Sequence, residues 1–486
     1  MVRPGHLRHL AVLSFWLVSL GCLVYREAWF PWVSQRGILE RVRVSAAGAP
    51  MAREDWKGIY ADKTKIGYLH EMSRPAVDPP GGSQVSQEGR VVLSMLGERR
   101  DLFFTSDLTV DADGQIVRSS SVLQFWPAKI SVDGIRKGRF LHLTVSQGKA
   151  QWTTVVPLPE NAISLETVSR LVAAGKLQKG ERLKLVLLDP FSLHPGEVEL
   201  LVQGRRLFYM PGRNLQATVL EVRYQGLSTT RWIGDDGTVL QEESPWGWTL
   251  RQEEAEKAAH IDLADWAHPP DLLAMVAVPT EVWIQQPRQV KLLQVAVHRP
   301  DRAEPEVLTL RAVEPPESSP QRPIRDPAFT KELSSTPFIQ VDDPAIQRSA
   351  KTVVGSETNS WAAARKINDW IYRSLRKAPT LGLPISTEVL RRMEGDCNEH
   401  TCLYVALARA SGIPCRIVMG LVYFDGAFVY HTWPKVYVGR WVELDPTLGQ
   451  APVDATHVPL MEADLEESVR MAPFVGKIQL KVQRYE

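Results

Sequence analysis

Two stretches near the C-terminal end decide the fold: residues 395–402 read GDCNEHTC, and residues 430–447 read YHTWPKVYVGRWVELDPT. The Gly-Asp pair breaks the pattern before it, and from Cys397 to Ala410 the apolar residues recur at helical spacing. The second stretch alternates apolar and polar residues on both sides of Gly439, which is typical of paired strands. Helices followed by an antiparallel sheet predict an α+β domain.

A cysteine at the start of a helix is well placed for nucleophilic chemistry. The free N–H groups and the dipole at that end favour a thiolate, and the same N–H groups can stabilise an oxyanion. Cys402 and Cys415 fall inside apolar patterns, where a buried and unreactive cysteine is the usual case. The sequence therefore predicts that Cys397 is the nucleophile.

The strand pattern shows whether a histidine base and a carboxylate can come into contact. A loop of odd length around Gly439 turns the apolar residues of both strands to one core and pairs Tyr437 with Trp441. In that register His431 and Asp445 both lie on the face away from the core, with their backbones at the diagonal spacing of ~7–8 Å, a gap that an imidazole and a carboxylate can bridge. A two-residue turn would instead put the two side chains on different faces of the sheet. The sequence thus predicts a catalytic triad of Cys397, His431 and Asp445.

Each of these residues, taken alone, is more often structural than catalytic, and only their conjunction favours catalysis. His400 with Cys397 and Cys402 offers a zinc alternative, but three ligands on one helix point in different directions and lack a second pair. Asp396 and Glu399 are expected to interact with the helix dipole. We predict no metal and no nucleotide cofactor, since the sequence has no phosphate-binding loop.

At these residues the sequence resembles the transglutaminase-like superfamily. The resemblance rests on the Gly-x-Cys helix start, the run ALARASGIPCR at 406–416, the His-x-Trp strand and the Trp-x-x-x-Asp-Pro-Thr end at 441–447, and it spans about residues 340–459. It implies a papain-like α+β domain with the cysteine at the start of the central helix.

The resemblance also implies roles for three residues: Cys397 as nucleophile, His431 as general base and Asp445 as the acid that orients the base. Pro434 and Lys435 depart from the hydrophobic-acidic pair that is common after His-x-Trp. No residue before Cys397 matches an oxyanion-stabilising side chain.

The N-terminus predicts a membrane anchor. Residues 10–25 (LAVLSFWLVSLGCLVY) carry no charge, and an aromatic cluster at 29–32 suits the bilayer interface. A cleaved signal peptide, for which no small-x-small site follows closely, and a buried core helix are the alternatives. We predict a tail at 1–9 and an uncleaved single transmembrane helix at 10–25, with the bulk extracytoplasmic (periplasmic), although the arginines after the run outnumber those before it.

Between anchor and C-terminal domain the pattern predicts strands. Residues 50–260 alternate like a large antiparallel β-domain with one helix, and residues 261–335 predict a small β-unit that ends in a Pro-rich linker. The catalytic domain is expected at 336–465, and a C-terminal strand or tail at 466–486. The first β-domain resembles, through Trp56-Lys-Gly-Ile-Tyr and Asp235-Asp-Gly-Thr-Val-Leu, those that precede such domains in bacterial envelope proteins.

Composition limits the function. Lys and Arg number 57 against 56 for Asp and Glu, a balance that argues against nucleic-acid binding, and 4 Cys cannot form a disulfide framework in a chain of 486 residues. The sequence predicts a membrane-anchored cysteine acyl-transfer enzyme, a peptidase, an amidase or an amine cross-linker, that acts on a protein, peptide or cell-wall substrate. The alternative is an envelope binding scaffold with a degenerate triad.

Overall fold

The computed structural model describes residues 52–486 apart from gaps at 96–97, 126–127, 149, 159–163, 190–193, 211, 225–226, 245–246, 263–270, 272–275, 301, 303, 315–316, 381–382, 466–470 and 472–473. The predicted membrane anchor at 10–25 lies outside these residues. Within the described part, no helix has the length and apolar character that crossing a membrane requires.

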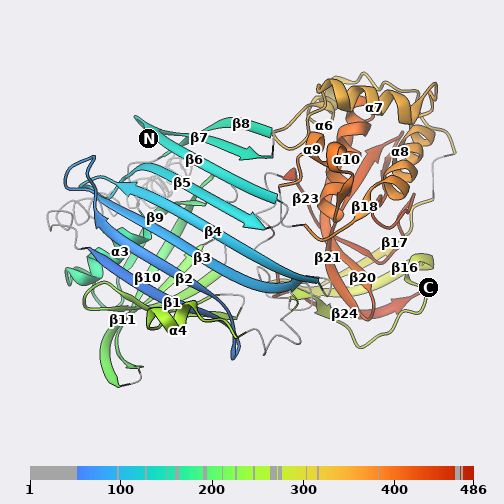
Figure 1. The fold of residues 1–486 in the computed structure, drawn as a ribbon. Helices are drawn as coiled ribbons and strands as arrows, with labels where there is room; N and C mark the ends of the chain where they lie inside the picture. The colour runs from blue at the N-terminus through green and yellow to red at the C-terminus, as the bar shows by residue number, and fades with distance from the viewer. Residues whose placement is uncertain are drawn as a thin grey trace, which may run out of the picture.

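The N-terminal half of the described chain forms one antiparallel sheet of 14 strands, as the alternating pattern predicts (Figure 1). Its first strands are β1 (Arg53–Ala61), β2 (Thr64–Pro75), β3 (Ser83–Met95), β4 (Glu98–Val110), β5 (Ile116–Phe125), β6 (Ala128–Lys137), β7 (Phe140–Gln147) and β8 (Ala150–Pro157). The others are β9 (Arg182–Asp189), β10 (His194–Met210), β11 (Arg213–Tyr224), β12 (Leu227–Gly234), β13 (Val239–Glu243) and β14 (Trp248–Gln252). Consecutive strands pair with each other from β1 to β8 and from β9 to β14, and β1 also pairs with β14, so β8 and β9 are the two ends of the sheet order.

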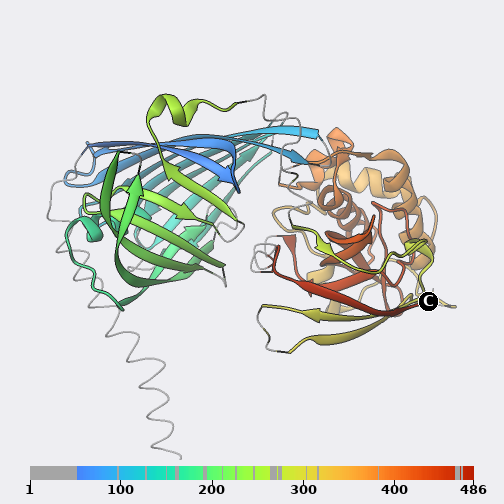
Figure 2. The ribbon, with the colours of Figure 1, turned by 90° about the horizontal axis from the view of Figure 1, so that it is seen from below.

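This sheet curls onto itself. Figure 2 shows the early strands, blue to cyan, facing the later strands in green. Val186 of β9 packs against the cluster that holds Leu141 and Val156 of β7 and β8, far away in sheet order. The predicted helix is confirmed as α3 (Leu165–Ala173), with Ser164 as its N-cap. Its buried residues pack on β9 to β13, so helix and curl together enclose the interior. A short helix α4 (Ala255–Ala259) follows the sheet.

The C-terminal part is the predicted α+β domain. Its helices are α6 (Thr330–Leu333), α7 (Pro344–Val354), α8 (Ser360–Ser374), α9 (Ser386–Arg392) and α10 (Cys397–Ala410). Its main sheet contains β15 (Val278–Pro279), β21 (Ala427–Tyr437), β20 (Cys415–Phe424) and β23 (His457–Glu462) in that order, with β22 (Trp441–Glu443) also on β21. A parallel pair, β18 (Arg376–Lys377) and β19 (Glu394–Gly395), leads into α10.

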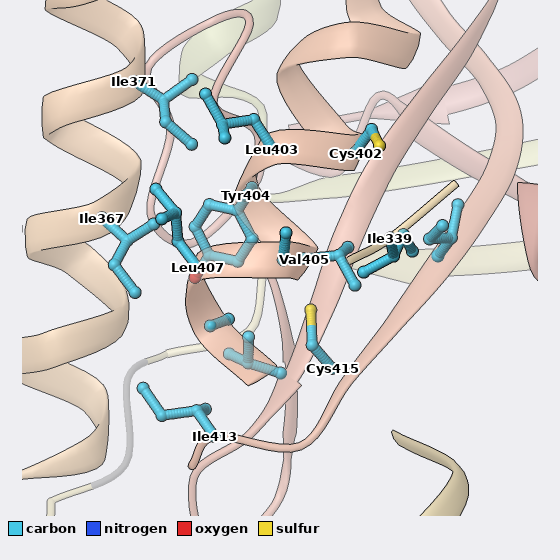
Figure 3. Packing of buried hydrophobic residues seen from close by; sticks show 14 of the residues in the cluster. Ile339, Ile367, Ile371, Cys402, Leu403, Tyr404, Val405, Leu407, Ile413 and Cys415 are labelled. Carbon is cyan, nitrogen blue, oxygen red and sulfur yellow. The ribbon is translucent and has the colours of Figure 1, made fainter. Parts of the chain in front are cut away.

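Helix α10 is the centre of this domain. Its side chains from Leu403 to Ala408 are all fully buried, because α7, α8 and α9 surround it on one side and β20 and β21 lie on the other. Cys402 and Cys415 point into this core, which Figure 3 shows at close range. Burial raises the pKa of the Cys415 thiol to about 12. Both cysteines are therefore buried, as the sequence predicts.

The region between the two parts is more structured than expected. β16 (Leu292–His298) pairs with β17 (Glu306–Arg311) on one side and with the C-terminal strand β24 (Gln479–Tyr485) on the other. The predicted Pro-rich linker at 298–327 thus contains a strand, β17. Short 3-10 turns at Pro287–Gln289 (η3) and Pro327–Phe329 (η4) flank this sheet.

The curled sheet contacts the C-terminal domain through its β7–β8 edge. The Gln147 amide donates to the main-chain oxygen of Leu383 at 2.8 Å and accepts from its N–H at 3.0 Å. Beside it, the rings of Trp152 and Phe338 meet edge to face with centroids 6.0 Å apart. The β-domain therefore supports the loop that leads to α9.

Candidate active site

The start of α10 is set by its own side chains. Asp396 is the N-cap, and its Oδ1 accepts a hydrogen bond from the N–H of Asn398 at 2.8 Å. Glu399 Oε2 accepts from the N–H of Asp396 at 2.9 Å, which completes a capping box. A Cβ on Gly395 would lie 2.2 Å from the Cβ of Glu399, so this position requires glycine. The helix begins at Cys397, as predicted.

The carboxyl groups of Asp396 and Glu399 were expected to act on the helix dipole as charges, but both pKa values are raised. Burial raises the pKa of Glu399 well above its usual range, and the neighbouring negative charge of Asp396 raises it further. Burial also raises the pKa of Asp396. Both effects favour the neutral form of Glu399, whose observed contact with the helix start is the hydrogen bond from the Asp396 N–H.

Cys397 is half-buried at this helix start. Burial raises the pKa of its thiol well above the usual value, and the negative charge of Asp396 acts in the same direction. The backbone N–H of Thr432 opposes this shift by donating towards the sulfur. The expectation of a resting thiolate is therefore wrong: the thiol is neutral in this structure, and its activation requires a base.

The hairpin has the predicted register. Tyr437 pairs with Trp441, and the N–H of Val438 bonds to the carbonyl of Arg440 across the turn at 2.9 Å. The ladder ends at β22, however, and Asp445 forms a bridge with Gln450 instead of continuing opposite the other strand. The acid thus leaves the sheet in a turn.

His431 and Asp445 are brought into direct contact. The Nε2–H of His431 donates to Oδ2 of Asp445 at 2.8 Å, and their exposed fractions are 9% and 0%. The other carboxylate oxygen accepts from the N–H groups of Thr447 and Leu448 at 2.7 and 3.0 Å. Burial alone would raise the pKa of Asp445, but the histidine charges and hydrogen bonds hold it well below its usual range. The Asp445 side chain is therefore ionised.

The Cys397 thiol lies against the backbone of the strand that carries His431. Thr432, whose N–H faces the Cys397 sulfur, directly follows His431 in β21. Asp445 is close enough for its charge to act on the thiol. Among the described residues, no hydrogen bond joins the Cys397 thiol to the His431 ring. Such contacts are often long before a substrate binds, so the arrangement is compatible with proton transfer.

His457 lies behind Asp445 and is not among the residues predicted from the sequence. Its Nε2 is 3.1 Å from the same Oδ2 that His431 contacts, and its ring is fully shielded. Burial alone would lower the pKa of His457, but hydrogen bonds and charges of Asp445 and Asp454 raise it to about 9. A histidine at the start of a strand twelve residues after Asp445 carries no sequence signal for this contact.

His431, Asp445 and His457 are also the described residues whose ligand atoms lie together, within 4.8 Å of one another. Both Nε2 atoms point at one carboxylate oxygen at hydrogen-bond distances, and His457 is protonated. In this arrangement the three residues form a hydrogen-bonded group around the Asp445 carboxylate.

The cluster considered for zinc is not assembled. The Nδ1–H of His400 donates to the carbonyl of Asp396 at 2.7 Å, and burial lowers the pKa of this histidine to about 4. Cys402 contacts the main-chain oxygen of Phe338 at 3.2 Å instead. His400, Cys402 and Cys397 therefore face different surroundings.

Of the two residues that depart from the family pattern, Pro434 is buried and Lys435 is partly exposed. Lys435 pairs with Glu443 at 3.5 Å and with Glu462 at 2.6 Å. The Trp433 indole donates to Glu443 at 2.9 Å, and its ring is stacked beside His431 with centroids 5.9 Å apart. The carbonyl of Pro434 accepts a hydrogen bond from the N–H of Leu444, the residue after β22, at 3.0 Å.

Comparison with known proteins agrees with this geometry. Residues 347–446 match the sequence profile of the transglutaminase-like superfamily. The C-terminal part of this chain is a transglutaminase-like domain. An uncharacterized protein of Haemophilus influenzae is 32% identical over 97 residues, which are 18% of this chain and 25% of the relative. The chain thus matches only a quarter of that relative's length.

Solved structures resemble parts of this chain. A candidate cysteine protease from Cytophaga hutchinsonii has 21% identity over 33% of this chain and 55% of its own, with a TM-score of 0.27. A β-barrel-like protein from Brucella abortus has 11% identity over 42% of this chain and 94% of its own, with a TM-score of 0.31. A candidate protease from Parabacteroides distasonis has 12% identity over 84% and 71%, with a TM-score of 0.21. Scores this low carry no argument about activity.

Proposed function

We propose that this protein is a cysteine acyl-transfer enzyme in which Cys397 is the nucleophile, His431 the general base and Asp445 the residue that orients the base. The observation that carries the proposal is the buried hydrogen bond between His431 and Asp445 beside the half-exposed thiol at the start of α10. The transglutaminase-like domain supports this class of chemistry.

The hydrogen bond between His431 and Asp445 supports one route for the proton. Because Nε2 of His431 donates to Asp445, Nδ1 is the nitrogen that is free to take the thiol proton. The Cys397 sulfur then attacks an amide carbonyl, the C–N bond breaks, and His431 returns the proton to the leaving amine. Water or a second amine attacks the resulting thioester, which gives an acid or a new amide and restores the thiol. Water makes the enzyme a peptidase or amidase, and an amine makes it a cross-linker.

The location of the enzyme is part of the same proposal. The uncharged run at 10–25 supports a single membrane anchor, and such an anchor would hold the enzyme against the cell membrane with its bulk on the extracytoplasmic side. A protein, peptide or cell-wall amide would then be the substrate. Fluorescence of a fused reporter on each side of the bilayer tests this orientation.

The acyl-enzyme can be tested without knowing the substrate. p-Nitrophenyl acetate supplies an activated acyl group, and peptide mapping after an acid quench locates it. The proposal predicts an acetyl group on Cys397, absent from the Cys397→Ser variant and formed far more slowly in His431→Ala. Acetylation elsewhere, or equal rates in wild type and His431→Ala, would contradict it. Adding n-butylamine then separates the two outcomes, because a cross-linker forms N-butylacetamide and a hydrolase releases mainly acetate.

A binding scaffold is the second candidate, and one observation favours it. The interior of the curled sheet holds a cavity of about 420 Å³, within the usual range for small-molecule sites. Lys57 lies there, almost fully buried, with its ammonium 3.9 Å from the nearest Glu71 oxygen. A scaffold would keep this cavity and show no acyl transfer at Cys397.

A further inference from the structure

One carboxylate oxygen of Asp445 contacts the imidazoles of both His431 and His457. This oxygen, Oδ2, lies 2.8 Å from Nε2 of His431 and 3.1 Å from Nε2 of His457. All three side chains are buried, and the rings of the two histidines have centroids 6.0 Å apart. Since a carboxylate only accepts hydrogen bonds, both histidines donate to it through Nε2–H.

The second histidine belongs to a chain of alternating charges. Nδ1 of His457 lies 3.6 Å from Oδ2 of Asp454, which in turn pairs with Arg288 at 2.9 Å. Asp454 Oδ1 accepts from the N–H of Thr456 at 2.7 Å, so this carboxylate is held in place. The order from the base outwards is therefore His431, Asp445, His457, Asp454 and Arg288.

We propose that His457 is a positioning residue of this active site: as a fixed cation behind Asp445, it holds the carboxylate in place and limits how strongly Asp445 makes His431 basic. This inference rests on the proposed function, because it assigns the residue that adjusts the base of that reaction. Among the described contacts, His457 does not touch the nucleophile Cys397, so its role is to position Asp445.

The physical reason is the balance of buried charge. A lone buried carboxylate favours a protonated histidine beside it, and a protonated His431 cannot accept the thiol proton. The charge of His457 already balances that of Asp445, while the 2.8 Å hydrogen bond from Nε2 still orients the His431 ring. Burial lowers the pKa of His457, but Asp445 and Asp454 raise it to about 9, which keeps it charged at neutral pH.

The surroundings leave His457 no other charged partner among the described residues. Trp433 confines its ring edge to face, with centroids 5.1 Å apart. Asp445 and Asp454 act on His457, and Arg288 acts on Asp454. Around His431, the titratable groups that interact with it are Asp445, Asp396 and His400. Of these, only Asp445 and Asp454 pair with His457 itself.

The test is the pH profile of Cys397 alkylation by iodoacetamide in the full-length chain. His457→Gln keeps a hydrogen-bond donor but removes the charge. Removing a cation raises the pKa of every titrating group nearby, so the acid limb of the profile should move up by about 1–2 pH units. His298→Gln, a histidine variant on β16 outside the site, should keep the wild-type profile.

The outcomes separate this inference from the proposed function. A profile in His457→Gln that is lowered in rate but unmoved in pH would overturn the positioning role and leave the triad standing. Alkylation of wild type that does not depend on His431 would overturn the triad itself.

A second measurement uses the wild-type chain alone, so it does not depend on whether a variant folds. In ¹⁵N-histidine NMR of the wild-type chain, which has 11 histidines, one imidazolium should persist at pH 8, where an ordinary histidine is neutral. Neutral rings throughout at pH 8 would overturn the proposal.

Discussion

The hydroxyl of Thr401 donates to the main-chain oxygen of Thr432 at 2.9 Å, and both residues are buried. Thr401 lies one turn after Cys397 in α10, and Thr432 follows His431 in β21. This bond therefore fixes the helix of the nucleophile to the strand of the base, and the Thr432 N–H faces the sulfur.

Thr401→Val should weaken both stability and activity. The change keeps the shape of the side chain but leaves the Thr432 carbonyl without this donor, at a cost of about 1–3 kcal/mol. The alkylation rate of Cys397 should also fall, because the helix can shift against the strand. Urea unfolding and iodoacetamide kinetics measure the two effects. Thr352→Val is the control, since its exposed hydroxyl bonds only within its own helix; equal losses in both variants would refute the coupling.

Gly395→Ala should displace the start of α10. An added Cβ would lie 2.2 Å from the Cβ of Glu399, so the capping box must open and Cys397 must move. We expect a loss of about 1–3 kcal/mol, as for other overpacked sites, and a large loss of acylation by p-nitrophenyl acetate. Gly234→Ala is the control, because its nearest atom is a side-chain oxygen of Asp236 at 3.0 Å. Wild-type acylation in Gly395→Ala would show that the capping geometry is dispensable.

Alkaline pH should destabilise the domain through His457. Its pKa is about 9 in the folded protein and near the usual 6.5 when unfolded. The stabilisation is therefore fully present below pH 6.5 and is lost as the pH rises through 9, amounting to about 2–3 kcal/mol. Pulse proteolysis in urea at pH 6.5 and pH 9.5 measures the difference. His457→Gln should lack most of this alkaline loss and His298→Gln should keep it; the same loss in all three proteins would assign it to other groups.

Gln147→Ala should loosen the contact between the β-domain and the catalytic domain. The variant removes both hydrogen bonds to the Leu383 backbone, so the loop before α9 should exchange its amide hydrogens faster. Hydrogen–deuterium exchange by mass spectrometry reports on this loop. Gln151→Ala, whose side chain reaches only Ser146 on its own hairpin, should leave the exchange unchanged. Unchanged exchange in Gln147→Ala as well would mean that Trp152 and Phe338 hold the contact without it.

Much of the fold of the C-terminal domain could be predicted from local sequence patterns. The break at Gly395-Asp396 placed the start of α10, because capping depends on side chains within one turn. The alternation around Gly439 gave the pairing of Tyr437 with Trp441, because a register slip would turn the apolar residues to solvent.

Contacts between distant segments could not be predicted in this way. Nothing near β24 indicates that it pairs with β16 almost two hundred residues away. Ser386 is the first residue of α9, and its hydroxyl donates to the side chain of Gln340, 46 residues earlier in the chain, at 2.7 Å. The contact of His457 with Asp445 arises in the same way, from the pairing of β23 with β20.

The central claim is that Cys397 is a nucleophile activated by His431, and the iodoacetamide alkylation rate of Cys397 tests it most directly. Peptide mapping of the native full-length chain should find Cys397 labelled while Cys402 and Cys415 stay unlabelled, with a rate that rises with pH. In His431→Ala this rate should fall by about tenfold or more. Labelling of Cys397 that is as slow as that of the two core cysteines, and is unchanged in His431→Ala, would contradict the account.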